Sequence, residues 1–322
     1  MFSVTGLGEI LIDFTPAGLS PAGNVMFERN PGGGPANLLA AVARLGGKGA
    51  FIGKVGNDQF GEYLKNVLVE NGIEASGLRF SKSVNTTLAF VHLDEKGERS
   101  FSFYRNPGAD LMLDERDLDF KLIENSKILH FSSLSLSDEP ARSATKSAIE
   151  YAKKHNKIIS FDPNWRPPLW KSEAEAKKQM KYGVENTDIL KISEVEMEFI
   201  TGERDLDIGS KILYETGVKL VVVTLGSQGC YYRSKAGTGR LPAYKTKVVD
   251  TTGAGDAFLG GLLYNISKMD VRPDQLTKEQ LEKIIDFSNA VGALCVTKRG
   301  GMPAMPSLQE VEACMKNTPK LI

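Results

Sequence analysis

Asp250-Thr251-Thr252-Gly253-Ala254-Gly255-Asp256 lies between two segments of different hydrophobic periodicity. Residues 244–249 alternate between apolar and polar, which predicts a half-buried strand, whereas apolar residues after 256 recur at helical spacing. The stretch is therefore predicted to be a glycine-rich turn that ends at a helix N-terminus. The first N–H groups of a helix lack partners, and the helix dipole adds about half a positive charge, so this turn predicts an anion site.

Asp256 closes the turn beside these N–H groups. We interpret it as a general base that accepts a proton from a hydroxyl attacking phosphorus, with the N–H groups of Gly253, Ala254 and Gly255 as the anion hole. On this stretch alone, a helix N-cap is the simpler interpretation of Asp256. No Gly-Lys-Ser or Gly-Lys-Thr follows, so this is not a Walker A loop, and the positive charge for phosphate chemistry must come from another part of the chain.

The composition excludes several classes of partner. The chain has 322 residues, is 41% hydrophobic, and balances 40 basic against 40 acidic residues, which gives no electrostatic case for binding nucleic acid or a membrane surface. We therefore expect a small-molecule partner. The three cysteines are scattered and lack metal-ligand spacing, which indicates free thiols in a reducing compartment. The sequence also has no basic N-terminal region and no apolar stretch of ~18 residues. Together these features predict a cytoplasmic location.

Strand-like and helix-like segments alternate along most of the chain, which predicts an α/β fold with a mostly parallel sheet. Strands are expected at 4–12, 50–55, 128–131, 157–161, 188–192 and 220–225, and helices at 58–70, 140–154, 193–201 and 281–297. Strand-like runs at 86–93 and 99–104 flank the polar segment 94–98 and predict a hairpin that folds over the site as a small β lid. No linker or repeat divides the chain, so we expect one domain, 1–322, with a lid from segments near 14–30 and 86–107.

Polar residues follow several of these strands, and ligands bind at the carboxyl ends of strands in open α/β sheets. Asp13 comes at the end of the first predicted strand, where a turn residue and an acceptor for sugar hydroxyls are equally good interpretations. The turn at residues 31–37, Pro-Gly-Gly-Gly-Pro-Ala-Asn, opens a helix. Its glycines permit close approach of a ligand, and Asn37 supplies both a donor and an acceptor. A Gly-rich turn alone is more often a simple loop.

Two arginines are candidates for the missing positive charge. Arg166 follows the strand at 157–161 and could clamp a phosphate, although a surface arginine stacked on Trp165 is the more common arrangement. Arg105 lies just past the second lid strand, where it is either a solvated charge or a contact to a substrate oxygen.

Two motifs together resemble the ribokinase-like (PfkB-type) carbohydrate kinases. DTTGAGDAFLGG at 250–261 resembles the C-terminal signature of that family, and PGGGPANLLAAVARLG at 31–46 resembles its N-terminal signature. They occur in the expected order and at the expected separation, and the resemblance extends over essentially the whole chain. The segments 103–105 and 162–166 look most like bacterial fructokinases. The resemblance implies a three-layer sandwich with a mostly parallel central sheet, flanking helices and a small β lid.

The resemblance also implies roles for residues at matching positions. Asp256 matches the catalytic base, and Arg166 is the expected phosphate clamp. The sugar is expected at Asp13, Gly33, Gly34, Asn37 and Arg105. ATP is expected at Ser193, Thr224, Gly226, Gly229, Gly253, Gly255 and Asn289. Glu196 is expected to act on Mg²⁺ through water, although Ser193 stands where the family has asparagine. Potassium is expected at carbonyls near Asp250, Thr252, Cys295, Lys298 and Gly300, although Ala304 lacks a hydroxyl sometimes found there.

The implied function is transfer of the ATP γ-phosphoryl group to a sugar hydroxymethyl group, first of all O6 of fructose. The open alternatives in the same class are 2-keto-3-deoxygluconate kinase, ribokinase and aminoimidazole riboside or nucleoside kinase. A non-catalytic sugar-binding regulator is disfavoured because Asp256 and both glycines are retained. A Rossmann dehydrogenase is disfavoured because Gly6-Leu7-Gly8 lacks the third glycine. A lid with an uncovered apolar face predicts a homodimer.

Overall fold

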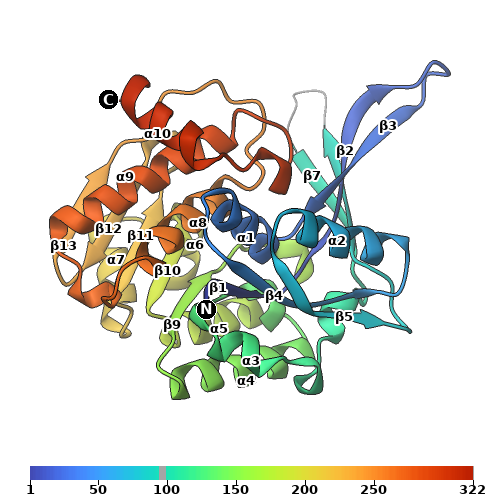
Figure 1. Ribbon diagram of the computed structural model, residues 1–322, viewed down its shortest axis with the longest axis horizontal. Helices are drawn as coiled ribbons and strands as arrows, with labels where there is room; N and C mark the ends of the chain where they lie inside the picture. Colours follow the sequence, from blue (N-terminus) through green and yellow to red (C-terminus); the bar gives the residue numbers. More distant parts are fainter. Residues whose placement is uncertain (94–98, 322) are drawn as a thin grey trace.

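The computed structural model describes residues 1–93 and 99–321. Within these residues a nine-stranded sheet has the order β13-β12-β11-β10-β9-β8-β1-β4-β5 (Figure 1). Neighbouring strands are parallel from β5 to β11, and β12 and β13 add an antiparallel hairpin at one edge. The strands are β1 Phe2–Leu7, β4 Gly49–Gly56, β5 Glu74–Ser81, β8 Ser126–Ser132, β9 Ile158–Asp162, β10 Ile189–Ser193, β11 Leu220–Thr224, β12 Cys230–Ser234 and β13 Gly237–Leu241.

Helices cover both faces of this sheet and enclose two hydrophobic clusters. One face carries α1 Gly34–Arg44, α2 Gln59–Glu70, α8 Ala254–Ser267, α9 Lys278–Cys295 and α10 Leu308–Asn317. The other carries α3 Phe120–Glu124, α4 Ala141–Lys154, α5 Glu173–Glu185, α6 Glu194–Thr201 and α7 Leu206–Glu215. Val222 of β11 belongs to the first cluster and its neighbours Val221 and Val223 to the second, because successive strand residues point to opposite faces. The predicted three-layer α/β fold is confirmed.

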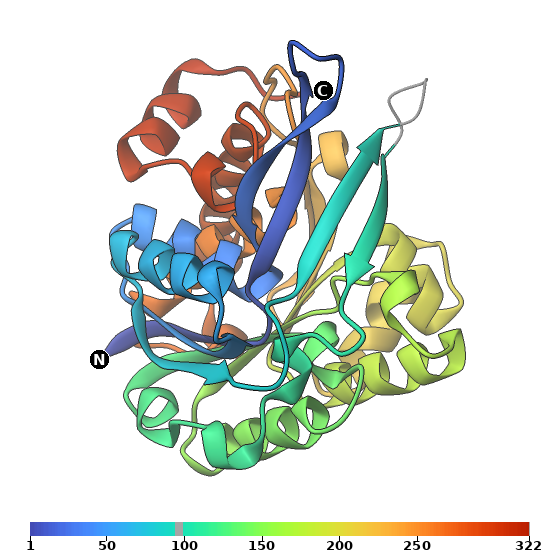
Figure 2. The ribbon, with the colours of Figure 1, turned by 90° about the vertical axis from the view of Figure 1, so that its right-hand side faces the viewer.

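A second, four-stranded sheet stands beside this body (Figure 2). Its order is β3-β2-β6-β7, with β2 Leu11–Leu19, β3 Val25–Gly32, β6 Leu88–Leu93 and β7 Arg99–Tyr104. Strands β2 and β6 pair in parallel, and each outer strand pairs antiparallel. Phe14 stacks on Phe90 at 4.8 Å between ring centroids, and Phe27 meets Phe90 edge-on at 5.6 Å. These four strands occupy the segments predicted to form the lid; the predicted turn at 94–98 lies outside the described residues.

Two predicted strands are wrong. The expected strand at 4–12 is divided, because the backbone leaves β1 at Gly8, where φ is 147°, and enters β2 of the other sheet at Leu11. Asp13 therefore lies within β2 and not beyond the end of β1. The expected strand at 244–249 is an extended segment whose one bridge, within the described residues, joins Tyr244 to Lys320. Val248 and Val249 are exposed, since no strand in the described part of the chain pairs with them.

Parallel register brings several strand ends to one edge of the large sheet. Ser132 of β8 is level with Asp162 of β9, and Ser193 of β10 is level with Thr224 of β11. The polar residues that follow these strands therefore share one edge, as expected for a ligand site. Among the helices of the described chain, none is long and apolar enough to cross a bilayer.

Candidate active site

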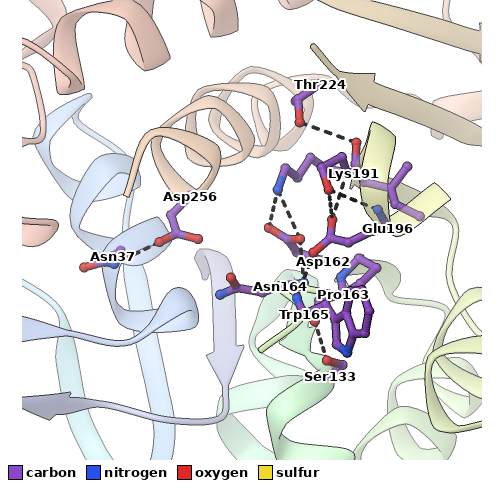
Figure 3. Close-up of polar contacts among 12 residues, drawn as sticks. Asn37, Ser133, Asp162, Pro163, Asn164, Trp165, Lys191, Glu196, Thr224 and Asp256 are labelled. Atoms are coloured by element: carbon purple, nitrogen blue, oxygen red, sulfur yellow. Dashed lines mark hydrogen bonds and ion pairs between the residues drawn. The ribbon is translucent and has the colours of Figure 1, made fainter. Parts of the chain in front are cut away.

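Asp256 lies in the first turn of α8, opposite the start of α1. Helix α8 begins after Gly253, whose φ of 77° is left-handed and suits a residue without a Cβ. The Asp256 carboxylate accepts a hydrogen bond from the Asn37 amide, with 2.8 Å between Nδ2 and Oδ2 (Figure 3). The two sequence motifs, which are far apart in the chain, therefore meet through their side chains.

The surroundings of Asp256 set its acidity. Burial raises its pKa from 3.8 to about 7, and the negative charge of Asp162 acts in the same direction. The Asn37 hydrogen bond and the cations of Lys191 and Arg166 act in the opposite direction. A carboxylate with a pKa near the operating pH is both substantially ionised and basic enough to accept a proton. The acidity of Asp256 thus suits a general base.

The start of α8 presents backbone N–H groups beside this carboxylate. No side chain of the residues that the structure describes caps this helix, whereas α9 is capped by Thr277. The N–H of Ala254 donates to the Thr251 carbonyl at a long 3.3 Å. Within the described residues, the N–H groups of Gly253 and Gly255 make no hydrogen bond. Two donors of the predicted anion hole are therefore free, and the third is only weakly engaged.

A cavity of about 410 Å³, here called the polar pocket, opens onto Asp256. Its walls come from the small sheet, the start of α1, the ends of β9 and β10, and the turn before α8. Sequence-predicted site residues that line it are Asp13, Gly33, Gly34, Asn37, Arg166, Ser193, Glu196, Thr252, Gly253, Ala254, Gly255 and Asp256.

The glycine turn before α1 is tightly enclosed. Gly33 has a φ of 110°, and a Cβ there would lie 2.4 Å from the Glu9 carbonyl oxygen. A Cβ on Gly34 would lie 2.5 Å from Asn164 Nδ2. The buried Glu9 carboxylate accepts a hydrogen bond of 2.9 Å from the Gly34 N–H and so fixes the turn. A side chain at either position would therefore clash with this wall of the polar pocket.

Asp13 reaches the polar pocket from β2, opposite Asn30 of β3. Burial raises its pKa from 3.8 to about 7; Arg166 opposes this shift, while Asp250 and Glu9 add to it. When ionised, a carboxylate only accepts hydrogen bonds. Asp13 is therefore placed to accept hydrogen bonds from hydroxyl groups at neutral and higher pH.

The two predicted arginine contacts differ. Arg166 lines the polar pocket with an exposed side chain; its Nη1 donates to the Trp165 carbonyl at 3.1 Å, while the Trp165 ring stacks on Phe199. Arg105 does not line the polar pocket. Its buried guanidinium forms an ion pair of 2.7 Å with Asp110 and also donates to the Leu134 carbonyl. Within the described structure, Arg105 anchors the base of the small sheet.

A second cavity of about 370 Å³ lies on the other side of the same turn; it is here called the nucleotide cavity because residues predicted to bind ATP line it. Its lining includes the predicted residues Thr224, Gly226, Gly229, Gly255 and Asn289. Thr251, Ala254 and Gly255 line both cavities. The Asn289 amide donates to the Leu241 and Pro242 carbonyls, so it also fixes the loop at the cavity wall. Ser193 lines the polar pocket and not this cavity.

Glu196 is the one acidic residue predicted to act on Mg²⁺. Its carboxylate accepts hydrogen bonds from the Ser193 N–H and hydroxyl at Oε2 and from the Trp165 N–H at Oε1. These three bonds leave one of about four lone-pair positions, and the side chain lines the polar pocket. Mg²⁺ keeps several waters and usually takes one or two carboxylates plus substrate phosphates, so a single water-mediated contact fits this arrangement.

The segments predicted to hold K⁺ do come together. The buried Asp250 carboxylate accepts the Thr252 N–H at 2.8 Å and the Gly300 N–H at 3.0 Å, so it ties the turn to the loop after α9. Cys295 Sγ lies 3.6 Å from the Thr252 carbonyl oxygen. The Cys295 carbonyl accepts from the Lys298 N–H. Carbonyl oxygens are ligands that suit hard cations, and this cluster lies directly beside the anion hole.

Sequence reasoning missed two charged residues of the polar pocket, Glu9 and Lys191. Lys191 lies in β10, and its ammonium contacts both oxygens of Asp162, at 3.0 and 3.2 Å (Figure 3). The signal was a lysine inside a short strand, Ile-Leu-Lys-Ile-Ser, that is otherwise apolar up to its last residue. A buried lysine requires a partner of opposite charge. The pattern within this strand could not show that the partner is Asp162.

This three-layer sandwich, with a small sheet over a polar pocket and a nucleotide cavity across one helix N-terminus, defines a ribokinase-like kinase. The chain belongs to the pfkB family of carbohydrate kinases, whose family model matches residues 1–308. It is 45% identical over 316 residues to fructokinase-2 of Solanum lycopersicum, covering 97% of this chain and 96% of that protein.

Solved structures show the same likeness. Fructokinase with bound ATP from Xylella fastidiosa superposes with a TM-score of 0.89 at 33% identity, covering 98% of this chain and 99% of that one. A fructokinase double mutant from Vibrio cholerae O395, in the form that binds fructose, ADP and a potassium ion, has a TM-score of 0.89 at 34% identity and covers 98% of each chain. The predicted family is confirmed.

Proposed function

We propose that this protein is a fructokinase, which transfers the γ-phosphoryl group of ATP to O6 of fructose. One observation carries the proposal: the Asp256 carboxylate lines the polar pocket beside Thr251, Ala254 and Gly255, which line both cavities. A sugar in the polar pocket and a nucleotide in the other cavity would therefore meet at a base and an anion hole. Relatives named fructokinase, and related structures that contain ATP or fructose and ADP, support the choice of substrates.

The proposed chemistry uses few groups. Asp256 takes the proton of the sugar hydroxyl as its oxygen attacks phosphorus, and Asn37 holds Oδ2 so that Oδ1 remains available. The free N–H groups of Gly253 and Gly255 stabilise negative charge on the transferring group. One well-aimed donor of this kind can be worth ~3 kcal/mol in a site with little water. Asp13 and the glycine turn before α1 orient the sugar.

Metal ions would assist from two sides. Glu196 would hold Mg²⁺ through water, and the ion would neutralise phosphate charge. Carbonyls around Asp250, Thr252 and Gly300 would hold K⁺ and strengthen the positive potential at the start of α8. Potassium dependence is proposed from the donor types at this cluster and from the potassium-bound Vibrio relative.

A coupled assay of ADP release tests the proposal. The panel is fructose, ribose, 2-keto-3-deoxygluconate and aminoimidazole riboside, each with ATP and Mg²⁺, with and without K⁺. We expect the highest kcat/KM for fructose and a higher rate with K⁺. A higher kcat/KM for another acceptor would overturn the choice of fructose. If the protein released no ADP with any acceptor but still bound fructose, the proposed function would change from a kinase to a sugar-binding regulator.

We further propose a single domain that forms a homodimer through the small sheet and acts in the cytoplasm. Large apolar side chains are exposed on this sheet, namely Leu19, Val25, Met26, Phe27 and Tyr104. Exposed apolar strand faces favour pairing with a second copy. Light scattering over a concentration series should give a dimer that Val25→Glu weakens and the control Val195→Glu, on α6, does not. A monomer at all concentrations would contradict the dimer. The three free cysteines are consistent with a reducing compartment.

A further inference from the structure

Lys191 is an unusual residue for the interior of a parallel sheet. It occupies the middle of β10, and its side chain is 9% exposed. Transferring an ammonium group from water into a protein interior costs several kcal/mol unless nearby groups compensate. Replacing both members of a buried ion pair with apolar residues often costs no stability, so stability alone does not explain a lysine at this position. The surroundings of the ammonium indicate what it is for.

Asp162 holds Lys191 in its charged form. Both carboxylate oxygens contact Nζ, at 3.0 and 3.2 Å, and the side chain of Asp162 is 4% exposed. Burial lowers the pKa of Lys191, but the carboxylates of Asp162 and Glu196 outweigh this, so its pKa is raised overall. Lys191 therefore carries a full positive charge at any pH at which the enzyme works.

The ammonium also lies against the anion hole. A Cβ on Gly255 would lie 2.8 Å from Nζ and 3.3 Å from Cε, so a side chain there would push the lysine away from the start of α8. Figure 3 shows the amine between Asp162 and this helix. An ammonium has three N–H donors. In the described part of the chain, its hydrogen bonds go to Asp162 alone, which leaves one donor for a ligand.

Arg166 is a weaker candidate for the same task. Its side chain is exposed and already donates to the Trp165 carbonyl. A charge in contact with water is strongly screened, whereas a buried, pre-oriented charge is screened less and needs no reorganisation during the reaction. The turn before α8 has no Walker-type lysine, so the positive charge at this anion site must come from another element. Lys191 of β10 can supply it.

We propose that Lys191 is a catalytic residue that contacts the transferring phosphoryl group at the start of α8, with Asp162 as the positioning residue that orients it. The inference rests on the proposed function and adds the residue that supplies fixed positive charge. Lys191 donates a hydrogen bond and forms no covalent bond. Asp256 remains the group that receives the proton of the sugar hydroxyl.

Two variants separate this role from a purely structural ion pair. Lys191→Met removes the charge but leaves Asp162 buried without its partner, so it should also destabilise the fold. Lys191→Met with Asp162→Asn removes both charges, and asparagine can still accept the Asn164 N–H that Asp162 accepts at 3.1 Å. Lys54→Met is the matched control, because Lys54 pairs with Asp117 at 2.7 Å with a side chain 16% exposed and lines neither cavity.

Three quantities are measured: the melting temperature, kcat with fructose, and the Kd values of ADP and a non-hydrolysable ATP analogue by calorimetry. The double variant should regain a melting temperature near wild type, yet kcat should stay ~10²–10³-fold low, as for loss of one oxyanion donor. Its affinity for the ATP analogue should fall about tenfold or more, because a charge-assisted bond is lost. ADP affinity and the Lys54→Met kinetics should be unchanged.

If the double variant is stable and either retains kcat or binds the ATP analogue as wild type does, the role assigned to Lys191 is wrong. The binding comparison does not need turnover. If the wild type phosphorylates no sugar, the proposed function fails, and the ATP analogue still tests whether Lys191 contacts the terminal phosphate.

Discussion

Replacing Asp256 with asparagine would separate the catalytic benefit of this buried carboxylate from its cost to stability. Asparagine has nearly the same shape, and its Oδ1 can accept the hydrogen bond that Asn37 donates at 2.8 Å. It cannot take a proton from the sugar. We expect kcat to fall by ~10²–10⁴-fold, which corresponds to ~3–5 kcal/mol, while fructose binding changes little.

The same substitution should stabilise the protein at high pH. The Asp256 pKa is raised from 3.8 to about 7, so the unfolded chain loses this proton near pH 4 and the folded chain near pH 7. Between these values the unfolded state binds fewer protons, so stability falls as pH rises, and the loss is complete above pH 7. Three pKa units correspond to ~4 kcal/mol as an upper limit. Asp256→Asn should gain up to this amount at pH 8 and almost nothing at pH 4.

The test combines urea unfolding at both pH values with the coupled assay and calorimetry of fructose binding. Asp270→Asn is the control, because that side chain is fully exposed and should show neither effect. Near wild-type kcat for Asp256→Asn would refute its role as the base. An equal stability change at pH 4 and pH 8 would refute the raised pKa.

Three further predictions follow from the same contacts. The kcat/KM for the sugar should fall below pH 7 with a slope steeper than one, because burial raises the pKa values of both Asp13 and Asp256 to about 7; a profile flat from pH 5 to 8 would contradict this. Arg105→Met should lower the free energy of unfolding in urea by ~3–5 kcal/mol, because the Asp110 carboxylate, 3% exposed, would lose its charged partner. An increased KM for fructose at unchanged stability would instead support the predicted sugar contact. Gly229→Ala should raise the KM for ATP and leave fructose binding unchanged, because a Cβ there would lie 1.9 Å from the Leu241 carbonyl oxygen, at the wall of the nucleotide cavity; an unchanged KM for ATP would show that the wall tolerates the shift.

The fold could be predicted because hydrophobic periodicity and burial have the same cause. Strand β11, Leu220–Thr224, is apolar up to its last residue because helices cover both faces of the sheet. The division of 4–12 could not be predicted, because its apolar residues are buried in both sheets and only the backbone at Gly8 changes direction. The alternation at 244–249 is typical of a strand, but this segment has one buried residue, Tyr244, and pairs with no strand among the described residues.

Parts of the site that lie within one motif were predictable, and parts that depend on distant contacts were not. The glycine turn and Asp256 carry their own signal, since a turn and a helix start define an anion site locally. The role of Lys191 can be recognised only from its contacts with Asp162 and Gly255, which belong to other elements. Arg105 was expected at the pocket because of its position after a lid strand, but the sequence did not reveal its buried partner Asp110.

The wall common to the polar pocket and the nucleotide cavity limits how the two substrates can react. Thr251, Ala254 and Gly255 border both spaces, so in the proposed reaction donor and acceptor would occupy the enzyme together, on either side of one helix end. Direct transfer between the two bound substrates is a single displacement that forms no phosphorylated enzyme. An ATP made chiral at its terminal phosphorus should give a product of inverted handedness, and labelled ADP should not exchange into ATP in the absence of sugar.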